Sequence, residues 1–138
     1  MQVKEFLENI RCTDMLIDSK IQQIKRIRES LCYAGVCYDG EKVQSSRNPD
    51  KFTDGVAKII ELEKMIDADI DTLVDNKRQA REMIETLDSI VEKTVLYKRY
   101  FENNSFDDIA VVMNYSVRRV YQLHADAISK LTLQFISL

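Results

Sequence analysis

The segment SFDDIAVVMNYSVRRVYQLH, residues 105–124, decides the fold of the C-terminal part of this chain. It predicts two short helices joined by a tight turn, because each half begins with a serine and carries its own apolar stripe. Ser105 can accept a hydrogen bond from the backbone N–H of Asp108, and Ser116 can cap the second helix. Asn114 tolerates the left-handed backbone that ends many helices. Two capped helices this close together form a helix-turn-helix.

The two apolar stripes predict which side of each helix is buried. They recur at helical spacing, as Phe106, Ile109, Ala110 and Met113 in the first helix and Val120, Leu123, Ala127 and Leu131 in the second. The opposite face of the second helix is positive, because no acidic residue lies between Ile109 and Ala125. An arginine can donate two bonds to guanine, and a glutamine can pair with adenine in the same way. That face therefore predicts contact with DNA, against the alternative of a solvated surface that carries two arginines.

The predicted DNA contacts come from both helices and from the helix before them. The residues predicted to contact DNA are the two capping serines and the positive face of the second helix: Ser105, Ser116, Val117, Arg118, Arg119, Tyr121, Gln122 and His124. Lys98 and Arg99, near the exposed end of a preceding helix that starts at Ser89, are predicted to contact phosphates.

Composition favours an all-α protein. The 138 residues include three glycines, one proline and 31% charged residues, so long stretches contain no helix breaker. The net charge of −3 does not exclude nucleic acid, because residues 53–85 carry nine acidic and five basic side chains, whereas residues 86–138 carry six of each. The acidity thus lies outside the predicted reading helix, and binding depends on the local patch.

The N-terminal part predicts a coiled-coil-like hairpin of two long helices. The first runs from about Lys4 to Tyr33 and the second from an N-cap at Thr53 to Leu87, each with apolar residues at alternating spacings of three and four. A polar stretch, residues 34–52, predicts a mobile loop between them. We expect domains at 1–86 and 87–138. Because the second helix is too long for the first to cover, we also expect a homodimer through these helices.

Other classes of protein find little support in the sequence. Residues 1–5 run into a charged helix rather than a signal peptide, and no apolar run approaches the ~20 residues that span a bilayer. We expect no membrane association and a cytoplasmic protein whose three cysteines, Cys12, Cys32 and Cys37, stay reduced. With one histidine and no phosphate-binding loop, we expect no catalytic residues, no metal and no cofactor.

The residues from 96 onward resemble the fourth region of sigma-70-type transcription factors. The similarity includes Arg99-Tyr100-Phe101, Ser105-x-x-Asp108-Ile109-Ala110, Met113-Asn114-Tyr115-Ser116 and Val120-Tyr121-Gln122-Leu123. More narrowly, the chain is similar to phage- and prophage-encoded sigma-70 region 4-like regulators, close to the ArpU and RinA late-gene regulators. The similarity to these phage regulators also includes two stretches outside the C-terminal part, Val43-Gln44-Ser45-Ser46 in the loop and the segment from Val56 to Glu63.

This resemblance implies a function. It implies sequence-specific binding to double-stranded DNA and control of phage late genes through RNA polymerase in the bacterial host cell. It also implies DNA contact at Arg118, Tyr121 and Gln122, with Val117 packing against the groove wall. Family members often have glycine in place of Asn114 and a charged residue in place of Tyr121, so their base preference does not transfer to this chain.

A second hypothesis remains open on the residues alone. An assembly or packaging adaptor, similar to a small terminase subunit, combines a helix-turn-helix that does not read DNA with coiled-coil oligomerisation. The balanced charge of residues 86–138 is compatible with this role. Oligomer size separates the two hypotheses, because a packaging protein forms a ring of many subunits.

Overall fold

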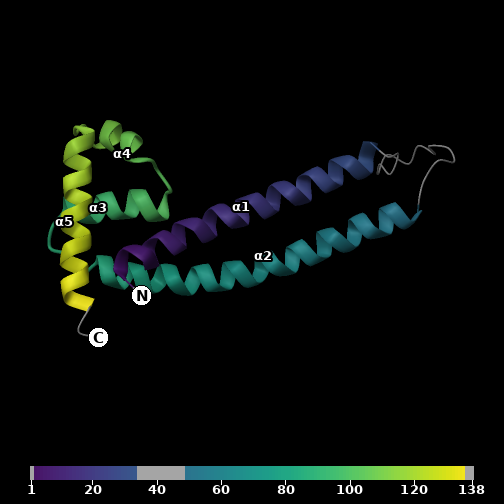
Figure 1. Ribbon diagram of the computed structural model, residues 1–138, viewed down its shortest axis with the longest axis horizontal. Coiled ribbons are helices and arrows are strands. Elements are labelled where there is room, and N and C mark those ends of the chain that lie inside the picture. Colours follow the sequence, from purple (N-terminus) through teal and green to yellow (C-terminus); the bar gives the residue numbers. More distant parts are fainter. Residues whose placement is uncertain (1, 34–48, 136–138) are drawn as a thin grey trace. The chain divides into compact units, whose positions relative to one another are not determined.

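The computed structural model describes residues 2–33 and 49–135, and these residues form helices with no β-strand among them. In chain order they are α1 (Val3–Tyr33), α2 (Pro49–Ile84), α3 (Ile90–Leu96), the π-helical segment η1 (Tyr97–Phe101), α4 (Phe106–Met113) and α5 (Val117–Phe135) (Figure 1). The predicted all-α class is therefore confirmed: two long N-terminal helices precede a small helical region.

The chain divides into two compact units, and the division falls inside both long helices. One comprises the described residues of 1–14 and 73–138 and is called the helix-turn-helix unit. The other comprises the described residues of 15–72 and is called the hairpin unit. The predicted domain boundary between residues 86 and 87 does not coincide with this division and stays a prediction.

Ion pairs and apolar residues hold the hairpin unit together. Lys20 bonds to Asp69, and Arg28 Nη2 lies 3.2 Å from Glu63 Oε1, so α1 and α2 run antiparallel there. The buried apolar residues recur every seventh position, as Ile17, Ile24 and Leu31 on α1 and Ile59 and Ile66 on α2. The seam is narrower than the sequence predicts, since Ile21 is 47% exposed and Ile70 is 41% exposed.

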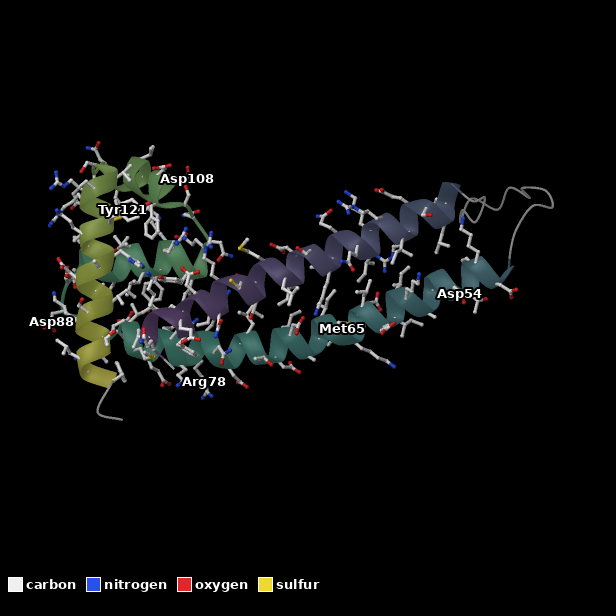
Figure 2. All side chains as sticks on the ribbon, in the orientation of Figure 1. Asp54, Met65, Arg78, Asp88, Asp108 and Tyr121 are labelled. Atoms are coloured by element: carbon white, nitrogen blue, oxygen red, sulfur yellow. The ribbon has the colours of Figure 1, made fainter. Side chains whose placement is uncertain are left out.

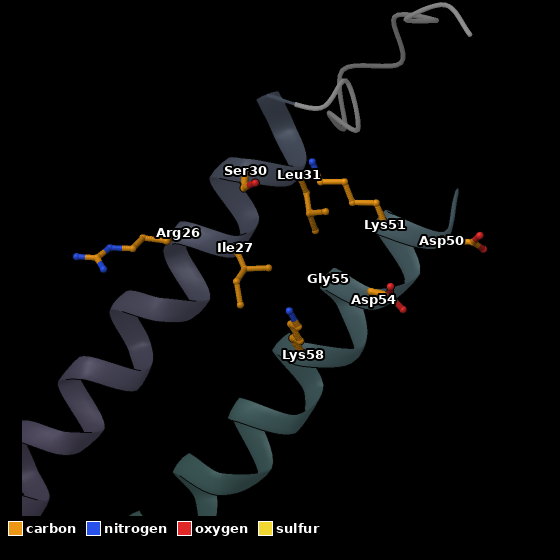
Figure 3. Close-up of a pocket in the computed structure, with 9 residues that line it drawn as sticks. All are labelled: Arg26, Ile27, Ser30, Leu31, Asp50, Lys51, Asp54, Gly55 and Lys58. Carbon is orange, nitrogen blue, oxygen red and sulfur yellow. The ribbon is translucent and has the colours of Figure 1, made fainter. Parts of the chain in front are cut away.

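Gly55 allows a close approach of the two helices. A Cβ at this position would lie 2.8 Å from Leu31 Cδ2, which is shorter than van der Waals contact. An open cavity of about 540 Å³ lies beside this contact (Figure 3). It is lined by Arg26, Ile27, Ser30, Leu31, Asp50, Lys51, Asp54, Gly55 and Lys58. None of these residues is a predicted site residue.

The start of the second long helix corrects the sequence prediction. The helix begins at Pro49 rather than after Thr53, which lies inside it. A proline lacks the N–H that the first turn leaves unpaired, and its fixed φ suits a helix start, so Asn48-Pro49-Asp50 need not be a turn. The predicted loop 34–52 is thus wrong for residues 49–52. Its remaining residues, 34–48, lie outside the described part of the chain, as does Cys37.

The core of the helix-turn-helix unit lies among α3, α4 and α5. Val95 from α3, Ile109 and Ala110 from α4, and Val120 and Leu123 from α5 form one buried cluster. Val91, Phe106 and Met113 pack against it from the edges. The stripes predicted for the two helices of the motif are therefore confirmed. A helix also starts at Ser89 as predicted, and Ser89 Oγ caps α3 by accepting the Glu92 N–H at 3.3 Å.

Polar contacts link other elements of this unit to one another. Asp14 Oδ2 accepts from Lys77 Nζ at 3.3 Å and from Asn103 Nδ2 at 2.9 Å, linking α1, α2 and the turn after η1. The buried carboxylate of Glu92 receives Lys130 Nζ of α5 at 2.9 and 3.1 Å. Removing one partner of such a contact would leave the other polar group partly buried and unpaired, which is destabilising.

Candidate nucleic-acid interface

Three polar residues set the ends of α4 and the start of α5. Ser105 Oγ accepts the Asp108 N–H at 3.1 Å, and Ser116 Oγ accepts the Arg119 N–H at 3.1 Å, so both predicted N-caps are confirmed. Asn114 adopts φ 60° and ψ 41°, the left-handed conformation predicted for it. The Tyr115 N–H then donates to the Ala110 carbonyl at 2.9 Å, which closes α4 as a Schellman motif. Local hydrogen bonds thus fix the point where α5 begins.

One face of α5 is exposed along its first three turns. Arg118 and Gln122 are exposed there, together with Val117 (37%) and Tyr121 (53%). Arg119, Ser105 and Ser116 are exposed as well. Figure 2 shows Tyr121 projecting from the part of α5 that lies beside α4. These side chains occupy the accessible positions that the sequence assigned to them, while their contact with DNA stays a prediction.

The structure corrects the placement of His124. Only 8% of this residue is exposed, and its Nε2 lies 2.7 Å from the hydroxyl oxygen of Tyr100 in the core of the unit. It shares the inner face of α5 with Val120 and Leu131, since residues four and seven apart lie on one side of a helix. His124 is therefore a core residue rather than a contact for DNA.

Burial shifts the pKa values of both His124 and Tyr100. Loss of water, followed by the positive charges of Lys4 and Arg99, lowers the pKa of His124 to about 4. Burial raises the pKa of Tyr100 to about 12. At neutral pH both groups are uncharged, so one neutral hydrogen bond joins η1 to α5.

The two predicted phosphate contacts of η1 are half-buried and already engaged. Lys98 Nζ lies 3.5 Å from Glu102 Oε2, one turn further along the chain. Arg99 Nη1 donates to the Asn104 carbonyl at 3.2 Å, and its guanidinium carbon lies 4.2 Å from the centre of the Phe106 ring. Arg99 thus helps to hold the start of α4, and whether either side chain also reaches a phosphate stays a prediction.

The sequence predicted Phe106 as a core residue and missed its contact with the exposed face. Its ring centre lies 4.6 Å from that of Tyr121, with the planes tilted by 34°, and 5.1 Å from that of His124 in an edge-on arrangement. Phe106 therefore connects the buried interior with an exposed aromatic side chain on α5. The spacing of Phe106 within α4 gives no sign of this role, because the contact depends on how α4 crosses α5.

Other kinds of site have little geometric support. Within residues 2–33 and 49–135, no three of the side chains of His, Cys, Asp or Glu are arranged to hold a metal ion. In the same ranges, no helix combines the length and the apolar character needed to cross a bilayer. Cys12 and Cys32 are both exposed.

Comparison with known proteins identifies the C-terminal segment. Residues 89–132 match the family model described as sigma-70, region 4. No curated protein and no solved structure matches the chain. The matched segment contains α3, η1, α4 and most of α5, which includes both capped helices and the exposed face. Residues 89–132 therefore form a sigma-70 region 4-like helix-turn-helix, a domain of DNA-binding, transcription-related type.

Proposed function

We propose that this protein is a sequence-specific transcriptional regulator that inserts α5 into the major groove of double-stranded DNA. The observation that carries the proposal is the exposed pair Arg118 and Gln122 on a helix whose start is fixed by Ser116. A bidentate donor and an amide on one face can distinguish guanine and adenine from other bases. The match of residues 89–132 to sigma-70 region 4 supports the same function.

The biological setting that we propose is control of phage or prophage late genes. It is suggested by the resemblance of residues such as Arg99-Tyr100 and Val43-Gln44-Ser45-Ser46 to ArpU- and RinA-type regulators. A sigma-70 region 4-like domain is compatible with a partner such as the RNA polymerase of the host. The protein would then act in the cytoplasm of the bacterial host cell. Polymerase would be recruited through protein contacts, while α5 selects the site.

We also propose that the protein acts as a homodimer through its long helices. The hairpin unit exposes several large apolar side chains, among them Met15, Leu16, Ile21, Ile60, Met65 and Ile70. Packing against a second copy would remove this surface from water. Two copies of α5 would then contact half-sites about 10 base pairs apart or a multiple of that spacing.

Selection of bound sequences from a random duplex pool, followed by a salt titration, tests the proposal. Each phosphate that a basic side chain such as Arg119 neutralises releases counterions, so log K should fall linearly with log salt, with a slope of about −0.9 per phosphate contacted. Light scattering on the same sample should give the mass of a dimer. Absence of any selected sequence would refute the function, and a ring of many subunits would favour the packaging adaptor instead.

A further inference from the structure

The exposed face of α5 has an apolar strip that hydrogen bonding to bases does not explain. Val117, Tyr121 and Ala125 follow one another at intervals of four residues and are all exposed. They therefore lie on one side of the helix, beside Arg118 and Gln122. Arginine and glutamine can recognise guanine and adenine. The strip has a tyrosine hydroxyl but otherwise only carbon atoms to offer.

Tyr121 is half-exposed, and its ring also packs against the helix-turn-helix unit. Its ring packs on Phe106 with 4.6 Å between ring centres. Phe106 is fixed in turn by the Arg99 guanidinium at 4.2 Å and by the edge-on ring of His124 at 5.1 Å. The part of Tyr121 that remains exposed therefore has a defined position relative to the backbone of α5.

Only one apolar group is available on the base edges of the major groove. Thymine presents its C5 methyl there, whereas cytosine, adenine and guanine present hydrogen-bonding groups. An apolar side chain on a helix in this groove gains stability by covering that methyl and loses it by covering a polar edge. The chemistry of the strip thus matches thymine.

We infer that Val117 and Tyr121 read the C5 methyl of thymine, with Phe106 as the residue that positions Tyr121. This inference rests on the proposed function, because it assigns a base to a surface that is proposed to enter the major groove. It predicts a thymine within the recognised site, next to the base pairs read by Arg118 and Gln122.

Deoxyuridine provides a direct test, because it lacks the methyl and keeps the hydrogen-bonding groups of thymine. Each thymine of the site selected by the full-length protein is replaced in turn, and Kd is measured by fluorescence anisotropy. At one or two positions the affinity should fall about four-fold, the factor that corresponds to about 0.8 kcal/mol for burying a group the size of CH₂.

Variants show which side chains cover the methyl. In Tyr121→Ala or Val117→Ala, the four-fold difference between thymine and deoxyuridine should disappear at the position that each residue covers. Phe106→Leu should reduce the difference although Phe106 touches no base, and Phe106→Tyr, which keeps an aromatic ring, should preserve it. Val91→Ala is the matched control, because Val91 is a partly buried residue of α3 that packs against the same core. Arg118→Ala should weaken binding to both duplexes and leave their ratio unchanged.

The outcomes separate this inference from the function beneath it. If the wild-type protein binds its selected site but tolerates deoxyuridine at every position, the strip does not read thymine and the inference is overturned. A loss in Phe106→Leu that Val91→Ala reproduces would show a general effect on folding and remove the positioning role. If the wild-type protein selects no sequence, the proposed function itself fails and the inference fails with it.

Discussion

Acidification from pH 7.5 to pH 5.5 tests the burial of His124 in the helix-turn-helix unit. The folded imidazole has a pKa of about 4, below its ordinary value of 6.5, mainly because it is buried. As the pH falls, the imidazole is protonated in the unfolded chain before it is protonated in the folded protein. The unfolding free energy is therefore little affected above about pH 6.5 and decreases as the pH falls from there toward 4. From these two pKa values, the unfolding free energy should be about 1.4 kcal/mol lower at pH 5.5 than at high pH. Well below pH 4 the total decrease should level off at about 3 kcal/mol.

Urea unfolding followed by circular dichroism measures this loss at the two pH values. His124→Gln is the matched control, since it removes the titrating ring and keeps a side chain able to bond to the Tyr100 hydroxyl. The wild-type protein should lose about 1.4 kcal/mol of unfolding free energy between the two pH values, and the variant less than about a third of that. Ordinary carboxylates contribute little to the difference, because they stay almost fully ionised at pH 5.5.

A second measurement reports the pKa of the folded protein directly. His124 is the only histidine of the chain, so a single imidazole signal titrates in an NMR spectrum. The signal should keep its neutral position down to about pH 5. A folded pKa near 6.5, or equal losses of stability in the wild-type protein and His124→Gln, would refute the argument.

Three further predictions concern local structure, each measured as unfolding free energy in urea. Ser116→Ala removes the N-cap of α5 and should lower the unfolding free energy by about 1 kcal/mol. Ser129→Ala, at an exposed interior position of α5, should lower it little. Equal losses in the two variants would contradict the capping role of Ser116. Asn114→Gly should change stability by only a few tenths of a kcal/mol, while Asn114→Val should lose about 1 kcal/mol or more, because a β-branched residue resists φ 60°. Lys20→Glu and Asp69→Lys should each destabilise the hairpin unit, and the double variant should recover about 1 kcal/mol; no recovery would show that the pair contributes nothing.

Local signals in the sequence were sufficient for much of the motif. Ser105, Ser116 and Asn114 act through hydrogen bonds and dihedral angles within a few residues, so their roles were predictable without knowledge of the tertiary structure. The buried stripes of α4 and α5 follow from helical periodicity for the same reason. Pro49 shows the limit of such signals, because proline suits both a turn and the first residue of a helix.

The residues that the sequence misplaced depend on tertiary packing. His124 lies on the buried stripe of α5, but its polar type made an exposed contact the natural prediction. Its burial is explained by a hydrogen bond to the Tyr100 hydroxyl and by the Phe106 ring, neither of which the sequence pattern shows. The contact of Phe106 with Tyr121 depends on how α4 crosses α5, which periodicity does not specify. Ile21 follows the heptad pattern and is nevertheless half-exposed, because the pattern predicts a direction on the helix and not the presence of a covering side chain.

The most direct test of the central claim is the sequence preference of Arg118→Ala. Binding sites are selected from one random duplex pool by the wild-type protein, by Arg118→Ala and by Arg78→Ala, whose exposed arginine lies on α2. If α5 reads bases, Arg118→Ala should lose its preference at one base pair of each half-site, at a cost of about 1–3 kcal/mol for each of these contacts. Arg78→Ala should select the wild-type sequence. An unchanged preference in Arg118→Ala would contradict the assignment of this face to DNA.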